Sequence, residues 1–420
     1  MRHHLSPVDA AWLHMESPTE PMTVCAVLSF AQPVRWEAIV QRVQERVLDV
    51  FPRFRQRIVE PALGIVGAFW EDDPTFALAA HLHRFALPRP GGPRELQAFV
   101  GDRIGTPLDL ARPAWSMDLV DGYGEGAAIV FRGHHCVADG MALGRVLLEL
   151  VDEPPAAPRP HGEVPPGEPW LHRLAHEGPD ALHALEKLLL TPHDAPTRLK
   201  GPLGVLKRAA WSAPIPMDVV RARGRALGAS VNDLLCAAVS GAIRRYLVDR
   251  GDPAVDVRAF VPVDLRGGDG ASLDPSLGTR FGLVYLSLPV ATPEPGVRVA
   301  EVKRRMDAIK ATPEAGLAFG LIGALGLLPA GVERRLADVF GAKCTIVLTN
   351  VRGPSAPVSI AGHPVSGMMF WVPQSGHLGV GVSLYSYANA IHIGVVTDVG
   401  LVPDPEALVA GIEAELGVAP

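Results

Sequence analysis

Apolar positions in the first third of the chain follow two spacings, one typical of strands and one typical of helices. Val24–Phe30 is a nearly continuous apolar run that predicts a strand. Apolar residues between 36 and 47 recur every three or four positions, which predicts an amphipathic helix. Ala127–Phe131 predicts a buried strand, and the helical pattern of Met141–Val151 follows it.

The same mixture of strands and helices returns in the second half. Ser230 is a suitable N-terminal cap for a helix from Val231 to about Leu247. The other elements expected there are strands over Val257–Val263, Leu283–Pro289 and Thr345–Leu348, three strands between Met368 and Val396, and a helix over Pro405–Leu416.

A proline-rich stretch separates these two halves. Ten of the chain's 40 prolines fall between residues 154 and 196, where a helix over Ala181–Leu190 is also expected. The sequence therefore predicts an α+β protein with an N-terminal lobe over 1–150, a crossover linker over 151–198 and a C-terminal lobe over 199–420. Binding sites favour the groove between two such lobes.

Composition narrows the class of protein. Apolar residues make up 48% of the 420 positions, which excludes general disorder. The formal net charge of −6 argues against a nucleic-acid partner. The four cysteines are about a hundred residues apart, too far apart in sequence for a close-spaced zinc or redox motif, and no signal peptide is visible. A reducing, cytoplasmic setting is therefore expected.

One apolar stretch, residues 315–332, raises the question of a membrane. It holds 18 residues without a charge, which is the short limit for crossing a bilayer, and it contains several glycines and one proline. A buried or interfacial pair of helices is the favoured interpretation, with contact to a membrane or lipid droplet open.

The string most specific for chemistry is residues 134–140, His-His-Cys-Val-Ala-Asp-Gly, between the predicted strand and helix. Adjacent side chains of a strand point to opposite faces, so only one of His134 and His135 can face a given cavity. A neutral imidazole there can accept a proton from a hydroxyl near neutral pH. Two structural alternatives stay open, in which Asp139 only caps the following helix and His134 is a satisfied core histidine.

This string resembles the HHxxxDG motif of coenzyme A-dependent acyltransferases. Further segments, in order along nearly the whole chain, resemble the bacterial wax ester synthase/diacylglycerol acyltransferase family. They are Leu-Ser-Pro-Val-Asp-Ala at 5–10, Thr-Pro-Leu-Asp-Leu-Ala-Arg-Pro-Ala-Trp at 106–115, Val-Asn-Asp at 231–233, Val-Pro-Val-Asp-Leu-Arg at 261–266 and Thr-Asn-Val-Arg-Gly-Pro at 349–354.

The resemblance implies a fold, a reaction and substrates. The expected fold has two lobes of the chloramphenicol-acetyltransferase type, each a mixed sheet with helices, and a tunnel between them. The expected reaction moves a long-chain acyl group from acyl-CoA to diacylglycerol or to a fatty alcohol. No cofactor or metal is implied, since acyl-CoA is a co-substrate. The expected location is the cytoplasm, peripheral to a membrane or lipid droplet.

The resemblance also implies roles for single residues. His135, with His134 beside it, would act as the general base without an acyl-enzyme, and would then protonate the departing thiolate. Asp139 would fix the turn by pairing with Arg266. Asn232 would donate a hydrogen bond to the oxyanion or orient the acceptor, with a helix-start cap as its structural alternative. Gly140 and Asp233 would support the site. For Asn350 a turn shaped with Gly353 and Pro354 is the favoured role, and contact with substrate is the alternative.

Departures from the family pattern and other functions stay open. Cys136 stands where alanine is usual, Thr279 where relatives tend to carry asparagine, and Arg352 where proline is common. Condensation domains and polyketide-associated acyltransferases share the histidine motif but use carrier-protein thioesters. A metal site on His134, His135 and Asp139, and a catalytically silent lipid-binding protein, are the remaining alternatives.

Overall fold

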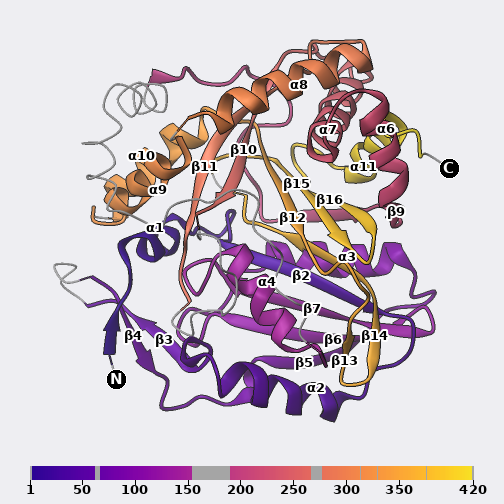
Figure 1. Cartoon of the computed structure of the whole chain (residues 1–420). Helices are drawn as coiled ribbons and strands as arrows, with labels where there is room; N and C mark the ends of the chain where they lie inside the picture. The colour runs from indigo at the N-terminus through magenta and orange to yellow at the C-terminus, as the bar shows by residue number, and fades with distance from the viewer. Residues whose placement is uncertain are drawn as a thin grey trace.

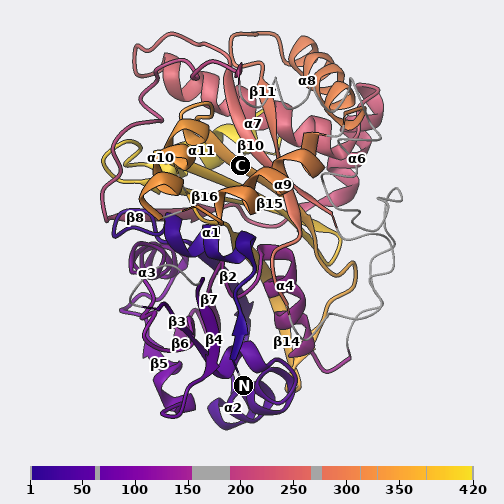
Figure 2. The ribbon, with the colours of Figure 1, turned by 90° about the vertical axis from the view of Figure 1, so that its left-hand side faces the viewer.

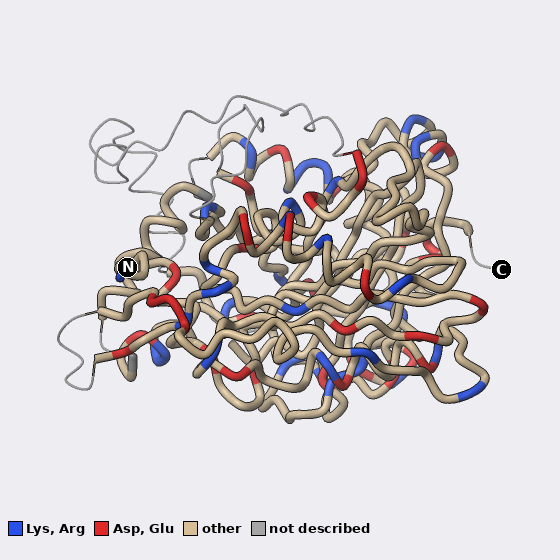
Figure 3. Tube along the Cα trace, turned by 90° about the horizontal axis from the view of Figure 1, so that it is seen from below, with Lys and Arg blue, Asp and Glu red and all other residues tan. Residues whose placement is uncertain are grey.

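The computed structural model describes residues 2–61, 67–153, 190–265, 277–312, 314–328, 330–374 and 376–418. Two sheets dominate it and form the centres of two lobes, drawn below and above in Figures 1 and 2. The protein is α+β, as the sequence predicts. Segments of Lys and Arg and segments of Asp and Glu are interspersed over a trace that consists mostly of other residues (Figure 3).

The first sheet has six strands in the order β13-β14-β2-β7-β6-β5. Its strands are β2 (Thr23–Phe30), β5 (Leu82–Ala86), β6 (Trp115–Tyr123), β7 (Gly126–His134), β13 (Ser359–Ile360) and β14 (His363–Trp371). A small three-stranded sheet lies beside it, with β1 (Arg2–His4), β3 (Gln56–Val59) and β4 (Phe69–Asp72).

The second sheet has the order β11-β10-β12-β15-β16-β8, and a short strand β9 also pairs with β16. Its strands are β8 (Lys207–Trp211), β9 (Ile215–Pro216), β10 (Val257–Asp264), β11 (Phe281–Leu288), β12 (Ile346–Arg352), β15 (Val380–Tyr387) and β16 (Ala390–Asp398). The helices are α1 (Pro7–Met15), α2 (Trp36–Val43), α3 (Pro93–Gly105), α4 (Gly140–Glu149), α6 (Met217–Ala226), α7 (Val231–Val248), α8 (Pro295–Lys310), α9 (Glu314–Leu325), α10 (Ala330–Gly341) and α11 (Pro405–Glu415).

Every strand and helix that the sequence predicts within the described residues is present, with ends shifted by a few positions. The helix expected over Ala181–Leu190, and most of the predicted linker, lie outside the described residues. The predicted helix over 36–47 begins as α2 and continues as a π-helical turn over Gln44–Leu48.

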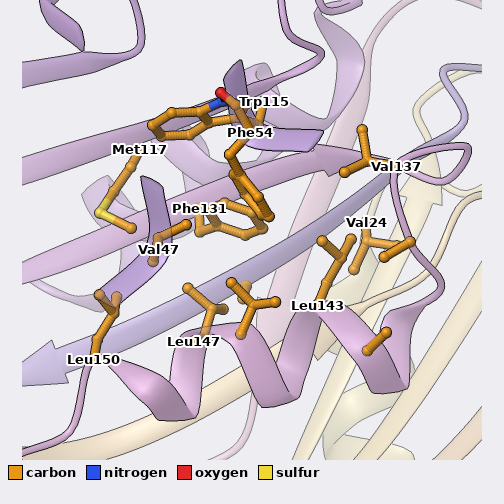
Figure 4. Packing of buried hydrophobic residues seen from close by; sticks show 14 of the residues in the cluster. Val24, Val47, Phe54, Trp115, Met117, Phe131, Val137, Leu143, Leu147 and Leu150 are labelled. Atoms are coloured by element: carbon orange, nitrogen blue, oxygen red, sulfur yellow. The ribbon is translucent and has the colours of Figure 1, made fainter. Parts of the chain in front are cut away.

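The strand that carries the histidine string is buried along its whole length. Residues 126–134 of β7 are covered on both faces because α4 packs on one side and α3 with β8 and β16 lie on the other. Leu143 and Leu147 of α4 face Phe131 of β7 in Figure 4. This packing fixes the end of β7 and the start of α4 relative to each other.

The two sheets are not built from one half of the chain each. β14 comes from the second half but pairs antiparallel with β2, so that Met369 lies opposite Val27 and Trp371 opposite Cys25. The first lobe therefore includes strands β13 and β14 from the range predicted as the C-terminal lobe. This exchange ties the lobes together one strand away from β7, which carries the histidines.

The apolar stretch 315–332 is divided between α9 and α10, and both helices pack against α1. Among the described residues, no single helix is long and apolar enough to cross a membrane. α6 and α7 pass that test only as a pair bent by 90°, by length and composition.

Candidate active site

The histidine string forms the end of β7, a tight turn and the start of α4. The backbone N–H of His135 donates to the carbonyl oxygen of Met22 at 2.7 Å, and that of His134 donates to Ala114 at 2.9 Å. The N–H of Val137 then returns to the carbonyl oxygen of His134 at 2.9 Å. The two histidines are thus fixed by neighbouring segments on either side of β7 before any side-chain contact is considered.

The ring of His135 lies at the seam between the two halves of the chain. It stacks on the indole of Trp12 in α1, with ring centroids 4.0 Å apart and an angle of 27° between the planes. Phe281, the first residue of β11, approaches from the second half with a centroid distance of 5.4 Å. His135 is only 3% exposed, so its ring is largely shielded from water.

His134 has different surroundings, as expected for neighbouring side chains at a strand end. Its Nδ1 accepts the backbone N–H of Cys136 at 3.1 Å, which places the ring proton on Nε2. Nε2 lies 2.6 Å from Oε2 of Glu16, and the same carboxylate oxygen accepts the N–H of Met22 at 3.2 Å. These contacts hold the ring of His134 against the turn and the segment after α1.

The thiol of Cys136 lies 2.8 Å from Nδ1 of His134, but its burial opposes formation of a nucleophilic thiolate. The side chain is fully buried, and burial raises the pKa of the Cys136 thiol well above its usual range. A protonated thiol in apolar surroundings behaves as a small hydrophobic side chain. The cysteine in place of the usual alanine therefore adds packing volume to the turn.

Asp139 caps α4 and also reaches the other half of the chain. Its Oδ1 accepts the N–H of Ala142 at 2.9 Å, which confirms the expected helix cap. Its Oδ2 accepts the backbone N–H of Arg280 at 2.9 Å. The predicted partner of this carboxylate, Arg266, lies outside the described residues, so that pairing stays a prediction.

A second buried carboxylate, Asp9 of α1, holds the same segment of the second half. Its Oδ1 accepts the N–H of Thr279 at 3.1 Å. Burial raises the pKa of Asp9, while the nearby cation of Arg53 opposes this shift. Gly278 precedes the two donors with φ at +110°, a conformation that requires glycine. Two carboxylates of the first half therefore clamp consecutive backbone N–H groups of the second.

Arg53 connects this clamp to the histidine turn. Its Nη1 donates to the carbonyl oxygen of Val137 at 2.8 Å and lies 3.4 Å from Oδ2 of Asp9. The guanidinium also lies over the ring of Trp70 at 5.0 Å. A cation with these three contacts stabilises the turn and the buried carboxylate together.

Three of the four polar site residues predicted in the second half lie close together at the start of α7. The Nδ2 of Asn350, on β12, donates to the Oδ1 of Asn232 at 2.6 Å. Asp233 is 1% exposed and forms a reciprocal capping box with Ser230, accepting its N–H at 3.0 Å. Asp233 therefore supports the helix that presents Asn232.

The structure gives no conformational reason for Gly140. Its φ is not positive, and an added Cβ would meet only the Cγ1 of Val372 at 3.5 Å, an ordinary contact. Among the described residues, no group of three or more His, Cys, Asp or Glu side chains is arranged to hold a metal ion.

Sequence reasoning missed the side chains that surround the histidines. Trp12, Glu16 and Arg53 belong to no pattern that marks them as site residues. Asp9 could have been found, because it lies in the segment 5–10 that resembles a family signature. A carboxylate inside such a motif, next to apolar positions, is a candidate for a buried interaction.

Family models match most of the chain. The model described as the wax ester synthase/diacylglycerol acyltransferase catalytic domain matches residues 5–213, and the corresponding C-terminal domain matches residues 277–418. The model of the phthiocerol/phthiodiolone dimycocerosyl transferase C-terminus matches residues 217–330.

Similar proteins cover nearly the full length. A Mycobacterium tuberculosis protein named "Probable diacyglycerol O-acyltransferase" is 29% identical over 447 residues, which span 98% of this chain and 94% of that protein. The wax ester synthase/diacylglycerol acyltransferase of Marinobacter aquaeolei VT8 matches in structure with a TM-score of 0.73 and 24% identity, over 99% of this chain and 98% of that one. The first condensation domain of the calcium-dependent antibiotic synthetase matches with a TM-score of 0.66 and 18% identity, over 100% and 95%. The two structural matches show the two-lobed fold.

Proposed function

This chain belongs to the wax ester synthase/diacylglycerol acyltransferase family of acyltransferases, and we propose that it moves a long-chain acyl group from acyl-CoA to the hydroxyl of diacylglycerol, of a fatty alcohol, or of both. The observation that carries this proposal is the position of His135. Its ring lies at the end of a buried strand of one sheet, between Trp12 of the first half and Phe281 of the second. A tunnel that brings the two substrates to this ring from different sides is part of the proposal.

His135 acts as a general base in this mechanism. Its neutral ring removes the proton of the acceptor hydroxyl while the oxygen forms a bond to the thioester carbonyl carbon. When the tetrahedral intermediate collapses, the carbon–sulfur bond breaks and the imidazolium returns the proton to the thiolate of coenzyme A. The products are an ester and free coenzyme A, and no group stays on the enzyme. Holding both reactants at one ring makes the step effectively unimolecular.

Other residues of the site support this step without exchanging protons. Asp139, His134 and Arg53 fix the turn that aims His135. The Oδ1 of Asn232 accepts from Asn350, which leaves its Nδ2 as a donor for the oxyanion. The contacts and the family pattern of the segments support these proposed roles.

We expect the enzyme to contact a lipid surface through the turn between α9 and α10, since both acceptors are poorly soluble in water. Leu327 is 74% exposed, and Val332 is 48% exposed near the start of α10. Sedimentation with phospholipid vesicles checks this directly. A protein that stays entirely in the supernatant at every lipid concentration would refute the peripheral contact.

The catalytic role is tested with His135→Ala, palmitoyl-CoA and a panel of acceptors that includes hexadecanol and dioleoylglycerol. Thiol release and ester formation should both fall by at least about a hundredfold, because the base is lost. His3→Ala is the matched control, since His3 lies in the exposed strand β1 and should leave turnover unchanged. Retained turnover in His135→Ala would exclude the general-base role. Ester or amide formation only from a carrier-bound thioester would instead favour the condensation-domain alternative.

A further inference from the structure

Helix α1 and the residue that follows it place three side chains at or beside the catalytic turn. Trp12 stacks on the ring of His135, Asp9 holds the backbone of Thr279, and Glu16, directly after the helix, contacts His134. A shift of α1 therefore changes the surroundings of both histidines at the same time. Residues that hold α1 in place therefore affect the reaction even if they do not contact substrate.

The helices α9 and α10 hold α1 from the second half of the chain (Figures 1 and 2). At the start of α1, the backbone of Gly326 lies against it so closely that an added Cβ would be 1.7 Å from the carbonyl oxygen of Pro7. One turn earlier in the chain, Gly323 of α9 also lies against α1, where an added Cβ would be 3.4 Å from the Cγ2 of Val8. No other residue type fits at 326 without moving one of these helices.

At the end of α1, two charged residues of α10 complete the contact. Oε2 of Glu333 lies 2.8 Å from Nδ1 of His14, and the Glu333 side chain is only 1% exposed. The Nη2 of Arg334 donates to the carbonyl oxygens of His14 at 3.1 Å and Glu16 at 2.6 Å. These bonds satisfy carbonyl groups at the helix end, where a helix leaves them without internal partners.

We propose that Glu333 and Arg334 are positioning residues for acyl transfer, which act through α1 on the placement of His134 and His135. This inference rests on the proposed function for its kinetic readout, but its structural part stands on contacts alone. Small displacements of groups that orient a catalytic side chain cost turnover even when they lie outside the reacting atoms. Neither residue contacts the histidine string itself in the described structure.

The contact between His14 and Glu333 makes the placement of α1 dependent on pH. His14 faces Glu333 of α10 and, through Nε2 at 3.4 Å, Glu60 after β3, while Arg334 lies beside Glu333. The hydrogen bond that the His14 ring donates to Glu333 raises the pKa of His14 above its usual value of 6.5, and burial raises the pKa of Glu333. A histidine whose pKa is raised by folding stabilises the folded state below its ordinary pKa and loses that contribution as pH rises through the raised value.

The test compares Glu333→Gln and Arg334→Met with a matched control, Glu415→Gln. Glu415 of α11 pairs with Arg298 of α8 at 2.5 Å, and Arg298 is 1% exposed, so the control also removes one charge from a largely buried ion pair. The measurements are kcat and KM for palmitoyl-CoA and acceptor between pH 6 and 9, and hydrogen exchange of peptides that cover residues 5–22.

For Arg334→Met we expect kcat to fall about tenfold with KM changed less than twofold, together with faster exchange across α1. For the wild-type protein we expect kcat to decline at alkaline pH, as His14 loses its proton beside Glu333. For Glu333→Gln we expect this decline to disappear, because a neutral His14 then no longer faces a buried carboxylate. Glu415→Gln should keep the wild-type pH profile and the wild-type exchange of α1.

Two results overturn the proposal. Either both α10 variants match Glu415→Gln in pH profile and in α1 exchange, or exchange of α1 increases while kcat stays at the wild-type level. A wild-type protein that transfers no acyl group to any acceptor refutes the proposed function instead. The exchange measurement then still shows whether α10 holds α1.

Discussion

Helices α4 and α7 both begin with a carboxylate-assisted cap, and they differ in how far that carboxylate reaches. At α7, the capping box of Ser230 and Asp233 is closed within four residues, since each accepts the backbone N–H of the other. At α4, Asp139 satisfies Ala142 with one oxygen and Arg280 of the other half with the second. One cap is local, and the other also joins two parts of the fold.

This difference explains why the histidine turn is sensitive to the whole assembly. Asp139 and Asp9 together hold the N–H groups of Thr279 and Arg280, so the turn and the segment before β11 are fixed as a unit. The cap of α7 does not depend on a distant segment, because Ser230 and Asp233 accept each other's backbone N–H groups. The comparison predicts that cap removal is costly to activity at α4 and only to stability at α7.

Asp139→Ala should have the largest effect. It leaves the N–H groups of Ala142 and Arg280 without this acceptor, which should lower the free energy of unfolding by about 3 kcal/mol. Turnover should fall by about a hundredfold, because the turn that aims His135 loses both its cap and its link to the other half. Thermal or denaturant unfolding and kcat on the folded fraction measure the two effects separately.

Ser230→Ala is the control for that prediction. It removes a cap of the same kind from α7 and should cost about 1 kcal/mol of stability while turnover stays within twofold. Equal losses of turnover in Asp139→Ala and Ser230→Ala would abolish the distinction between a local cap and a cap that joins the halves. Asp139→Asn, which keeps one acceptor oxygen, should lie between wild type and Asp139→Ala.

Local structure at both helix starts could be predicted from the sequence. The apolar run before His134 and the helical pattern after Gly140 place the string between a strand and a helix, as found. Ser230 caps α7 at the predicted residue. These features depend on neighbours within a few positions, so periodicity and capping preferences contain the necessary information.

The long-range partners could not be predicted in this way. Periodicity does not say that β14 pairs with β2, about 340 positions apart along the chain, nor that Trp12 stacks on His135. The short strands β1, β3 and β4 contain few apolar residues and give a weak pattern. Asp139 as a helix cap was foreseen as an alternative, whereas its bond to Arg280 depends on how two halves meet.

Substitution of Asn232 tests whether the start of α7, although its cap is local, contributes to the acyl-transfer step. If its Nδ2 donates to the oxyanion, Asn232→Ala should lower kcat by about tenfold, which is less than for a fully buried donor because Asn232 is half-buried. Asn350→Ala should cost about threefold, since it removes the bond that orients the Asn232 amide but leaves the donor in place. Steady-state kcat at saturating palmitoyl-CoA is the measurement, and unfolding midpoints check that α7 is intact.

The relative losses of kcat in Asn232→Ala and Asn350→Ala distinguish a catalytic from a structural role of Asn232. A donor to the oxyanion makes Asn232→Ala worse than Asn350→Ala, and the double variant no worse than Asn232→Ala, because the orienting bond has no value once the donor is gone. If kcat is unchanged in Asn232→Ala while the unfolding midpoint falls as in Ser230→Ala, then Asn232 serves only the helix start. In that case the start of α7 contributes only to stability, and the groups that act in the reaction lie at the turn after β7.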